Sequence, residues 1–342
     1  MKTRILLVFT GGTIGSQAEN GNIDLNPNAS FKLLQLFTQR FADAEQVSFK
    51  TLLPIQILSE NLHPQHWTTI INAIEAEALS QFDGIIVTHG TDTLAFSASA
   101  LGLYFNQLSI PLLMVSSDLP LDNPQANGIP NLIAAVEFIR QIAEPGVFVA
   151  YQNPQQPLQI HQATRLAQCL PLSSDFISAQ SKAYMCFSEQ GFERLSDTAP
   201  TTRNPIKLKA DFSARILLIK PYPGLNYDQF NLDQIDAVLH DLYHSGTACS
   251  SDSYGQQHDL VAFIKRCRQQ NINIYLAPAI HSETAYSSTR ELLAHGGEMI
   301  WNLSLEAAYA KLLLAYSNFN TPQAISEFLA KDIAGEYIKS LN

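Results

Sequence analysis

Short runs of β-branched and other apolar residues alternate with stretches of helical periodicity, and this alternation constrains the fold more than any other feature. The runs are apolar along almost their whole length and are bounded by turn residues, which is typical of strands buried on both faces. They lie at residues 5–9, 84–88, 111–116 and 146–150. Helical periodicity occupies residues 64–79, 93–105 and 129–142. This order predicts a mainly parallel sheet covered by helices on both faces.

The pattern lapses once, in a polar stretch that contains Pro200 and Pro205, and then resumes. We therefore expect an N-terminal α/β domain over residues 1–192, a linker over 193–212 and a smaller C-terminal α/β domain over 213–342. The second domain is expected to contain strands at residues 215–220, 237–239 and 272–276, and helices at 257–270, 289–295 and 305–315.

Composition excludes several classes of protein. Hydrophobic residues make up 46% of the 342-residue chain and charged residues only 15%, which argues against intrinsic disorder. A net charge of -10 and the lack of Lys/Arg runs argue against nucleic-acid binding. No apolar run is long enough for a membrane helix, and the apolar run after Arg4 is too short for a signal peptide. The four cysteines form no CxxC pair, so we expect free thiols and a cytoplasmic location.

Two of the expected strands end in unusual polar sequences. The first strand runs into Thr-Gly-Gly-Thr-Ile-Gly-Ser at residues 10–16, where glycines allow a sharp turn and leave N–H groups free to hold an anion. A plain tight turn is the alternative interpretation of this segment. It is not GxGxxG, because position 13 is threonine, and it is not a P-loop, because no Gly-Lys-Ser/Thr follows.

The second polar sequence is Thr-His-Gly-Thr-Asp-Thr at residues 88–93. Asp92 and Thr93 are good helix N-caps, so a capping segment is one interpretation. A hydroxyl beside a carboxylate at a strand end also suits acid–base chemistry on a small polar substrate. The two sequences together, on strands that could be neighbours, point to a ligand site more strongly than either alone.

Other motifs are weak. No GxSxG occurs. His63 and His66, and likewise His240 and His244, have zinc-like spacings, but no set of cysteines or carboxylates completes either site. We therefore expect these histidines to lie on the surface or to be hydrogen-bonded within the protein.

The paired motifs resemble those of the bacterial L-asparaginase family, and the run HGTDTLAFSASAL at residues 89–101 is similar to its type I, cytoplasmic branch. Weaker similarity at residues 222–224 and 292–297 extends the resemblance over nearly the whole chain. It implies two three-layer α/β domains with mainly parallel sheets, the C-terminal one flavodoxin-like.

The resemblance also implies roles for individual residues. Thr13 matches the family's nucleophile, which attacks the side-chain amide and forms an acyl-enzyme. Thr91 and Asp92 match the pair that positions water, moves protons and holds the substrate α-amino group. Ser59 matches the serine that binds the α-carboxylate, and Glu60 is its neighbour in the site. A threonine hydroxyl needs a base or a hydrogen-bond chain to become a nucleophile, which agrees with such a cluster.

The backbone of Gly12 and Gly90 is expected to contribute N–H groups to substrate binding. Asp118 ends Val-Ser-Ser-Asp, where the family has Thr-Gly-Ser-Gln, and is expected to contact substrate. Asn127 lies in Ala-Asn-Gly, where the family has Ser-Asp-Gly.

Two further positions depart from the family pattern. Arg165 aligns with the family's catalytic lysine; it is expected to orient groups and stabilise charge, but unlike lysine it cannot lose a proton. Asn22 aligns with a tyrosine that contacts the nucleophile.

The resemblance implies hydrolysis of L-asparagine to L-aspartate and ammonia, without metal or organic cofactor. It further implies a homodimer or homotetramer with the site at a subunit interface. Two different functions remain open: a divergent amidase or esterase that uses Thr13 on another small substrate, and a catalytically silent relative that binds an amino acid or a partner protein.

Overall fold

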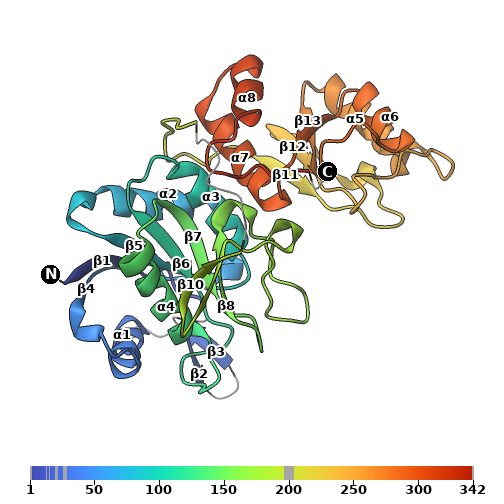
Figure 1. Cartoon of the computed structure of the whole chain (residues 1–342). Helices are drawn as coiled ribbons and strands as arrows, with labels where there is room; N and C mark the ends of the chain where they lie inside the picture. Colours follow the sequence, from blue (N-terminus) through green and yellow to red (C-terminus); the bar gives the residue numbers. More distant parts are fainter. Residues whose placement is uncertain are drawn as a thin grey trace. The chain divides into compact units, whose positions relative to one another are not determined.

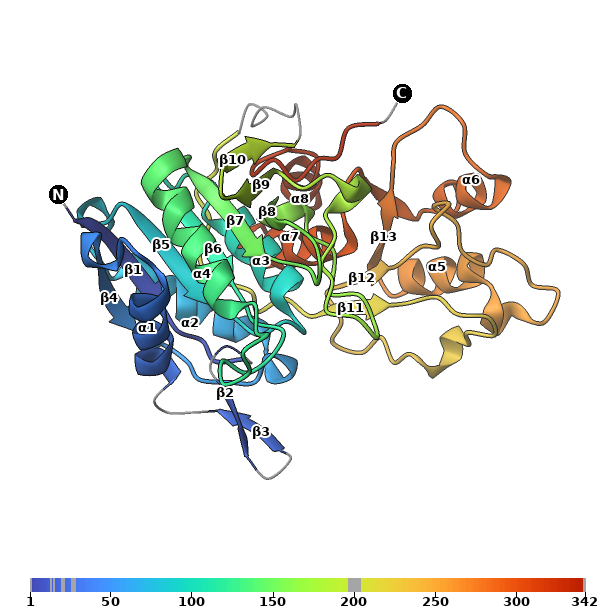
Figure 2. The same ribbon diagram turned by 60° about the horizontal axis from the view of Figure 1, so that its bottom comes forward.

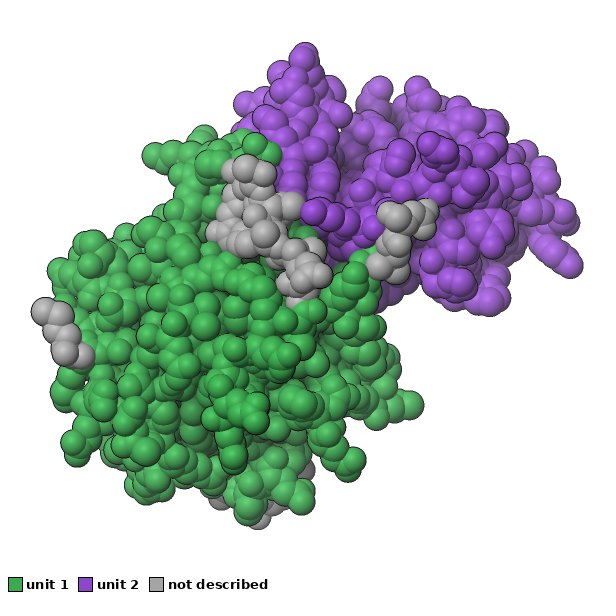
Figure 3. All heavy atoms as spheres, viewed as in Figure 1, with its two compact units in different colours: residues 1–212, 333–335 green, residues 213–332, 336–342 purple. Residues whose placement is uncertain are grey.

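The computed structural model describes residues 2–12, 14, 16–19, 22–25, 29–195 and 204–340. The chain forms two compact units, one of residues 1–212 with 333–335 and one of residues 213–332 with 336–342 (Figure 3). Among the described helices, none has the length and apolar character needed to cross a membrane.

Unit 1 is built on an eight-stranded sheet in the order β10-β9-β8-β7-β6-β5-β1-β4 (Figure 1). Neighbouring strands from β4 to β7 are parallel, whereas β8, β9 and β10 pair antiparallel. The four strands expected in this half are confirmed. The strands are β1 (Thr3–Val8), β4 (Val47–Leu52), β5 (Gly84–Thr88), β6 (Pro111–Val115), β7 (Gly146–Tyr151), β8 (Leu158–Gln162), β9 (Met185–Ser188) and β10 (Gly191–Arg194).

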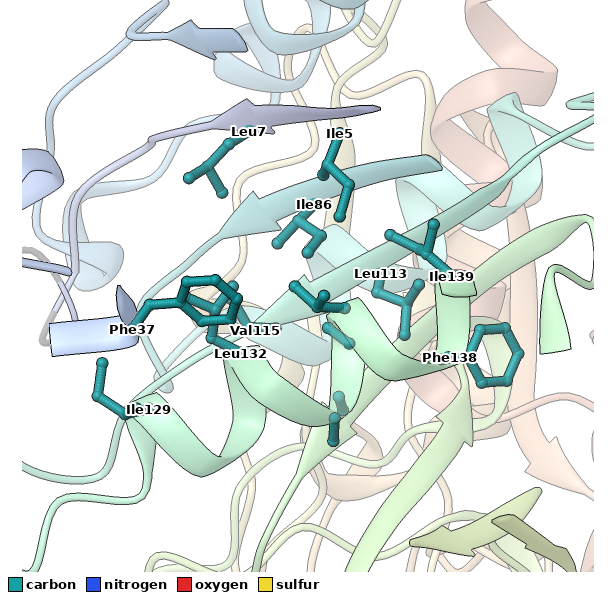
Figure 4. Packing of buried hydrophobic residues seen from close by; sticks show 14 of the residues in the cluster. Ile5, Leu7, Phe37, Ile86, Leu113, Val115, Ile129, Leu132, Phe138 and Ile139 are labelled. Atoms are coloured by element: carbon teal, nitrogen blue, oxygen red, sulfur yellow. The ribbon is translucent and has the colours of Figure 1, made fainter. Parts of the chain in front are cut away.

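Helices cover both faces of this sheet. On one face, α1 and α4 pack onto the side chains of alternate strand residues such as Ile86 and Leu113 (Figure 4). On the opposite face lie α2 and α3 (Figure 2). A hydrogen bond from Trp67 Nε1 to Ser97 Oγ joins these two helices. The helices are α1 (Ala29–Arg40), α2 (Pro64–Glu75), α3 (Leu94–Tyr104) and α4 (Gly128–Glu137); shorter elements are the hairpin β2 (Ser16–Glu19) and β3 (Asn22–Leu25), and the 3-10 helices η3 (Ser59–Asn61) and η6 (Ala163–Arg165).

Unit 2 contains a four-stranded sheet in the order β11-β12-β13-β14, parallel throughout. Its apolar core joins the strands to α5 and α6 on one face, while Tyr316 of α7 reaches Tyr275 of β13 on the other. The elements are β11 (Ile216–Ile219), β12 (Ala237–His240), α5 (Leu260–Gln269), β13 (Asn273–Ala279), α6 (Ser287–Ala294), β14 (Glu298–Trp301), α7 (Leu305–Asn318) and α8 (Pro322–Leu329). The predicted α/β class with two layered sheets is confirmed.

The described parts of the expected linker, residues 193–212, belong to unit 1. Glu193 and Arg194 lie in β10 and pair with β9. The Asn106 side chain bonds both backbone groups of Ile206, at 2.9 and 3.0 Å, as a neighbouring strand would. Phe212 packs edge-on against Trp67 with ring centroids 5.3 Å apart. The polar composition of this stretch predicts a linker and gives no indication of these contacts.

A buried ion pair fastens the C-terminal segment of unit 2. Lys311 of α7 and Glu336 are both fully buried, with Nζ 2.6 Å from Oε1. The Lys311 ammonium also donates to the Lys331 carbonyl and lies 5.1 Å from the ring centre of Tyr337. A charge this deep is tolerated only with such partners.

We expect Lys311→Met to lower the free energy of unfolding by about 3–5 kcal/mol, because the Glu336 carboxylate then loses its buried cation. Urea denaturation followed by intrinsic fluorescence measures the change. The double variant Lys311→Met/Glu336→Leu should regain most of the loss, since it removes both charges. A double variant as unstable as the sum of the two single variants would contradict this account.

Candidate functional site

The two polar sequences that follow β1 and β5 lie side by side. The strands are parallel neighbours, so both sequences leave the same edge of the sheet. The Thr10 hydroxyl donates to the Thr88 carbonyl at 2.6 Å. Gly12 has a φ of +77°, and a Cβ built on it would lie 2.3 Å from the Cα and N atoms of Gly90. The two backbones therefore touch, and only glycine fits at position 12.

The segment around η3 joins this contact as a third strand-end loop. The Gly12 N–H donates to the Ile57 carbonyl at 2.9 Å. Ser59 is buried, and its hydroxyl donates to Asp92 Oδ2 at 3.2 Å. In the opposite direction, the Thr93 hydroxyl donates to the Ser59 carbonyl at 2.9 Å. Thr93 therefore ties two loops together, and its side chain does not cap α3.

Most of the residues expected in the site converge at this edge. Gly90 is so close to Ser59 that a Cβ on the glycine would lie 2.4 Å from the serine Oγ. Thr91 is half-buried between Gly90 and Asp92, and Glu60 is exposed on η3. Thr13 falls outside the described residues.

Asp118 follows β6, the next strand of the sheet, and is held by Asn127. The Asp118 N–H donates to Asn127 Oδ1 at 2.9 Å, and the Asn127 N–H donates to Asp118 Oδ1 at 3.1 Å. The Asn127 amide also donates to the Gln152 carbonyl at 2.9 Å. Two positions that depart from the family pattern are thus bonded to each other. A direct role for Asp118 with substrate stays a prediction.

Arg165 lies in η6, beside the second half of α3. Its neighbour Thr164 packs so closely on Gly102 that a Cβ there would be 2.8 Å from the threonine Cγ2. Arg165 Nε donates to the Gly335 carbonyl at 2.7 Å, whereas the hydrogen bond described at Asp92 comes from Ser59. The antiparallel course of β8 carries the chain back from the carboxyl edge of the sheet. A catalytic role for Arg165 stays a prediction.

Asn22, the other departure, begins β3 and pairs with Glu19 of β2.

Three of the four histidines with zinc-like spacing make hydrogen bonds within the protein, and His244 is exposed on the surface. The His63 side chain accepts from the Gln65 N–H at 3.3 Å, and His66 Nδ1 accepts from the His63 N–H at 2.9 Å, which caps α2. His240 Nε2 lies 2.9 Å from the Tyr227 hydroxyl. Across the described part of the chain, no cluster of three or more His, Cys, Asp or Glu side chains is arranged to hold a metal ion.

One residue at the site, His89, was not singled out from sequence. His89 is 1% exposed, and burial lowers its pKa to about 4 despite the Gly90 carbonyl and the Asp92 charge, which both favour the charged ring. His89 stands inside a recognised motif, but the motif does not indicate that its ring is buried.

The site offers hydroxyls and the exposed carboxylates of Glu60 and Asp92 at the carboxyl edge of the sheet, which suits a small polar substrate. The Gly12 N–H was expected to bind substrate, but it is already donated to the Ile57 carbonyl. The model of the family described as Asparaginase, N-terminal, matches residues 4–193, more than half of the chain. The chain belongs to the asparaginase family. The match covers Gly12, Ser59, Gly90 and Asp92 together.

Relatives and solved structures agree with this family. The chain is 27% identical to the D subunit of the glutamyl-tRNA(Gln) amidotransferase of Methanococcus maripaludis, over 99% of this chain and 81% of the relative. The D subunit of the same enzyme from Aeropyrum pernix is 28% identical, over 97% and 79%. These matches leave the type I bacterial branch unconfirmed.

The fold matches solved asparaginase structures. The thermostable L-asparaginase from Thermococcus kodakarensis has a TM-score of 0.80 at 23% identity, over 99% of this chain and 100% of that one. L-asparaginase I from Vibrio cholerae has a TM-score of 0.77 at 21% identity, over 99% and 100%.

The contact between Gly90 and Ser59 can be tested by a double-mutant cycle. Gly90→Ala should lower the free energy of unfolding by about 1–3 kcal/mol, because the new Cβ overpacks the serine side chain. In a Ser59→Gly background the same change should cost at least about 1 kcal/mol less. Urea denaturation of the four proteins gives the coupling. An equal cost in both backgrounds would show that the two residues do not touch.

Proposed function

We propose that this member of the asparaginase family hydrolyses the side-chain amide of L-asparagine to L-aspartate and ammonia through a threonine acyl-enzyme. One observation carries the proposal: Gly12, Ser59, Gly90 and Asp92 meet at one edge of the sheet, with Ser59 bonded to Asp92 at 3.2 Å. These are the positions at which the family holds an amino-acid substrate.

In this proposal Thr13 is the nucleophile. Its hydroxyl attacks the amide carbon, ammonia leaves, and water then releases aspartate from the ester. Asp92, exposed and negatively charged, binds the substrate α-amino group, and Ser59 binds the α-carboxylate. Thr91 positions the water or moves its proton. The N–H groups at the strand ends stabilise the negative charge on the carbonyl oxygen.

Glutamine is the second candidate substrate. The relatives from Methanococcus and Aeropyrum are named as subunits of a glutamyl-tRNA(Gln) amidotransferase. This chain is 27% identical to such a subunit over 99% of its own residues. In this second candidate function it serves a similar assembly and hydrolyses glutamine, whose side chain is one methylene longer than that of asparagine. Activity on a different amide or ester is a third candidate function, and binding of an amino acid or partner protein without turnover is a fourth.

A homodimer or homotetramer, a cytoplasmic location and independence of cofactors are parts of the same proposal. So is the assignment of catalysis to the N-terminal domain, with residues 213–342 as a smaller second domain.

Thr13→Ala should abolish ammonia release from asparagine, because it removes the proposed nucleophile. Thr13→Ser is the matched control and should keep measurable activity, since it keeps the hydroxyl. Ammonia is measured by a coupled assay with purified protein, with glutamine run in parallel. Ammonia release from glutamine alone would select the second candidate. Release that persists in Thr13→Ala would exclude the proposed nucleophile.

We further expect Arg165→Lys not to increase turnover, because Arg165 Nε bonds the Gly335 carbonyl and η6 packs against the later part of α3. The change should lower stability by roughly 1 kcal/mol through loss of that hydrogen bond. Steady-state kinetics and urea denaturation measure the two effects. A rise in kcat of tenfold or more would place residue 165 in the proton relay.

A further inference from the structure

His89 is buried and directly precedes Gly90 of the candidate site. One of its ring nitrogens is hydrogen-bonded, and the other lacks a partner among the described residues. Nδ1 is 2.8 Å from the Gly90 carbonyl oxygen. Nε2 is buried and has no hydrogen-bond partner among the residues that the structure describes. Leaving a buried polar atom without a partner costs about 1–3 kcal/mol. The hydrogen bond that the His89 ring makes within the described structure is therefore the one from Nδ1.

The bonded nitrogen determines how the ring is protonated. A carbonyl oxygen only accepts, so Nδ1 must carry the proton and donate it. Burial lowers the pKa of His89 to about 4, so near neutral pH the ring holds that single proton. The imidazole is thus a fixed, uncharged donor to Gly90.

This hydrogen bond determines the orientation of the next peptide group. Glycine has no side chain to restrict rotation about its own backbone, so the peptide between Gly90 and Thr91 needs an external restraint. In a trans peptide the C=O and the following N–H point in opposite directions. Because the Gly90 carbonyl points to the buried ring, the Thr91 N–H points away from it. Among the described residues, none accepts a hydrogen bond from this N–H.

We propose that His89 is a positioning residue: its Nδ1–H holds the Gly90–Thr91 peptide so that the Thr91 N–H is presented to a negatively charged oxygen of the substrate or its transition state. The inference rests on the proposed function for the identity of the substrate. It assigns to His89 a task separate from proton transfer.

Two variants separate positioning from simple packing. The leucine in His89→Leu fills much of the ring's volume but has no hydrogen-bond donor. Because the Thr91 N–H is then misplaced, kcat should fall roughly tenfold to a hundredfold. KM should change less than about threefold. His89→Asn places an amide N–H near the position of Nδ1 and should restore kcat to within about fivefold of wild type.

His161 provides the matched control. It is also fully buried in unit 1, its Nδ1 lies 2.8 Å from Ser178 Oγ, and its Nε2 likewise lacks a partner among described residues. His161→Leu removes a comparable ring from the interior and should leave kcat within about threefold of wild type. An equal loss of kcat in His161→Leu and His89→Leu would overturn the proposal, because it would indicate general damage to the core.

A readout without catalysis keeps the inference separate from the proposed function. The Thr91 amide resonance should shift when aspartate is titrated into wild type and His89→Asn, but not into His89→Leu. If the wild-type protein hydrolyses neither asparagine nor glutamine, the proposed function fails. The positioning role of His89 is then tested by the shift of the Thr91 amide resonance alone. An unchanged kcat, or the same Thr91 shift in His89→Leu as in wild type, would overturn the positioning role.

Discussion

The site depends on the direct contact between the backbones of Gly12 and Gly90. A single methyl group at Gly12 would overlap the Gly90 backbone at 2.3 Å. Because both glycines end strands of one parallel pair, the position of one loop is set by the other, and both are set by the sheet. The precision of the candidate site thus derives from the most rigid part of unit 1.

Hydrogen bonds then fix the third loop to this pair. Ser59 donates its hydroxyl to Asp92 and accepts from Thr93 through its carbonyl. The two bonds run in opposite directions between the same short segments, so neither segment can rotate without breaking one of them. The Asp92 carboxylate also lies just before α3, where the positive end of the helix dipole favours a negative charge.

The sequence predicted the parts of the molecule that rest on periodicity and local turn chemistry. Strand β5 was expected with its exact bounds, because its five residues are all buried between two helical layers. The antiparallel strands β8 to β10 were missed: they have only four or five residues each, and no α-helix lies between them to mark the alternation. Arg165 follows β8, whose antiparallel direction could not be read from the sequence around it. The bond from His89 to its own neighbour leaves no pattern in the sequence at all.

The grouping of the last residues has a consequence for how the chain is divided. Residues 333–335 belong to unit 1, although the residues on both sides of them belong to unit 2. Their Gly335 carbonyl accepts the Arg165 hydrogen bond, and the next residue is the buried Glu336. No single cut of the polypeptide can therefore release unit 1 with all of its contacts. A fragment that ends at residue 212 would lack residues 333–335 of unit 1 and, with them, the carbonyl that accepts the Arg165 hydrogen bond.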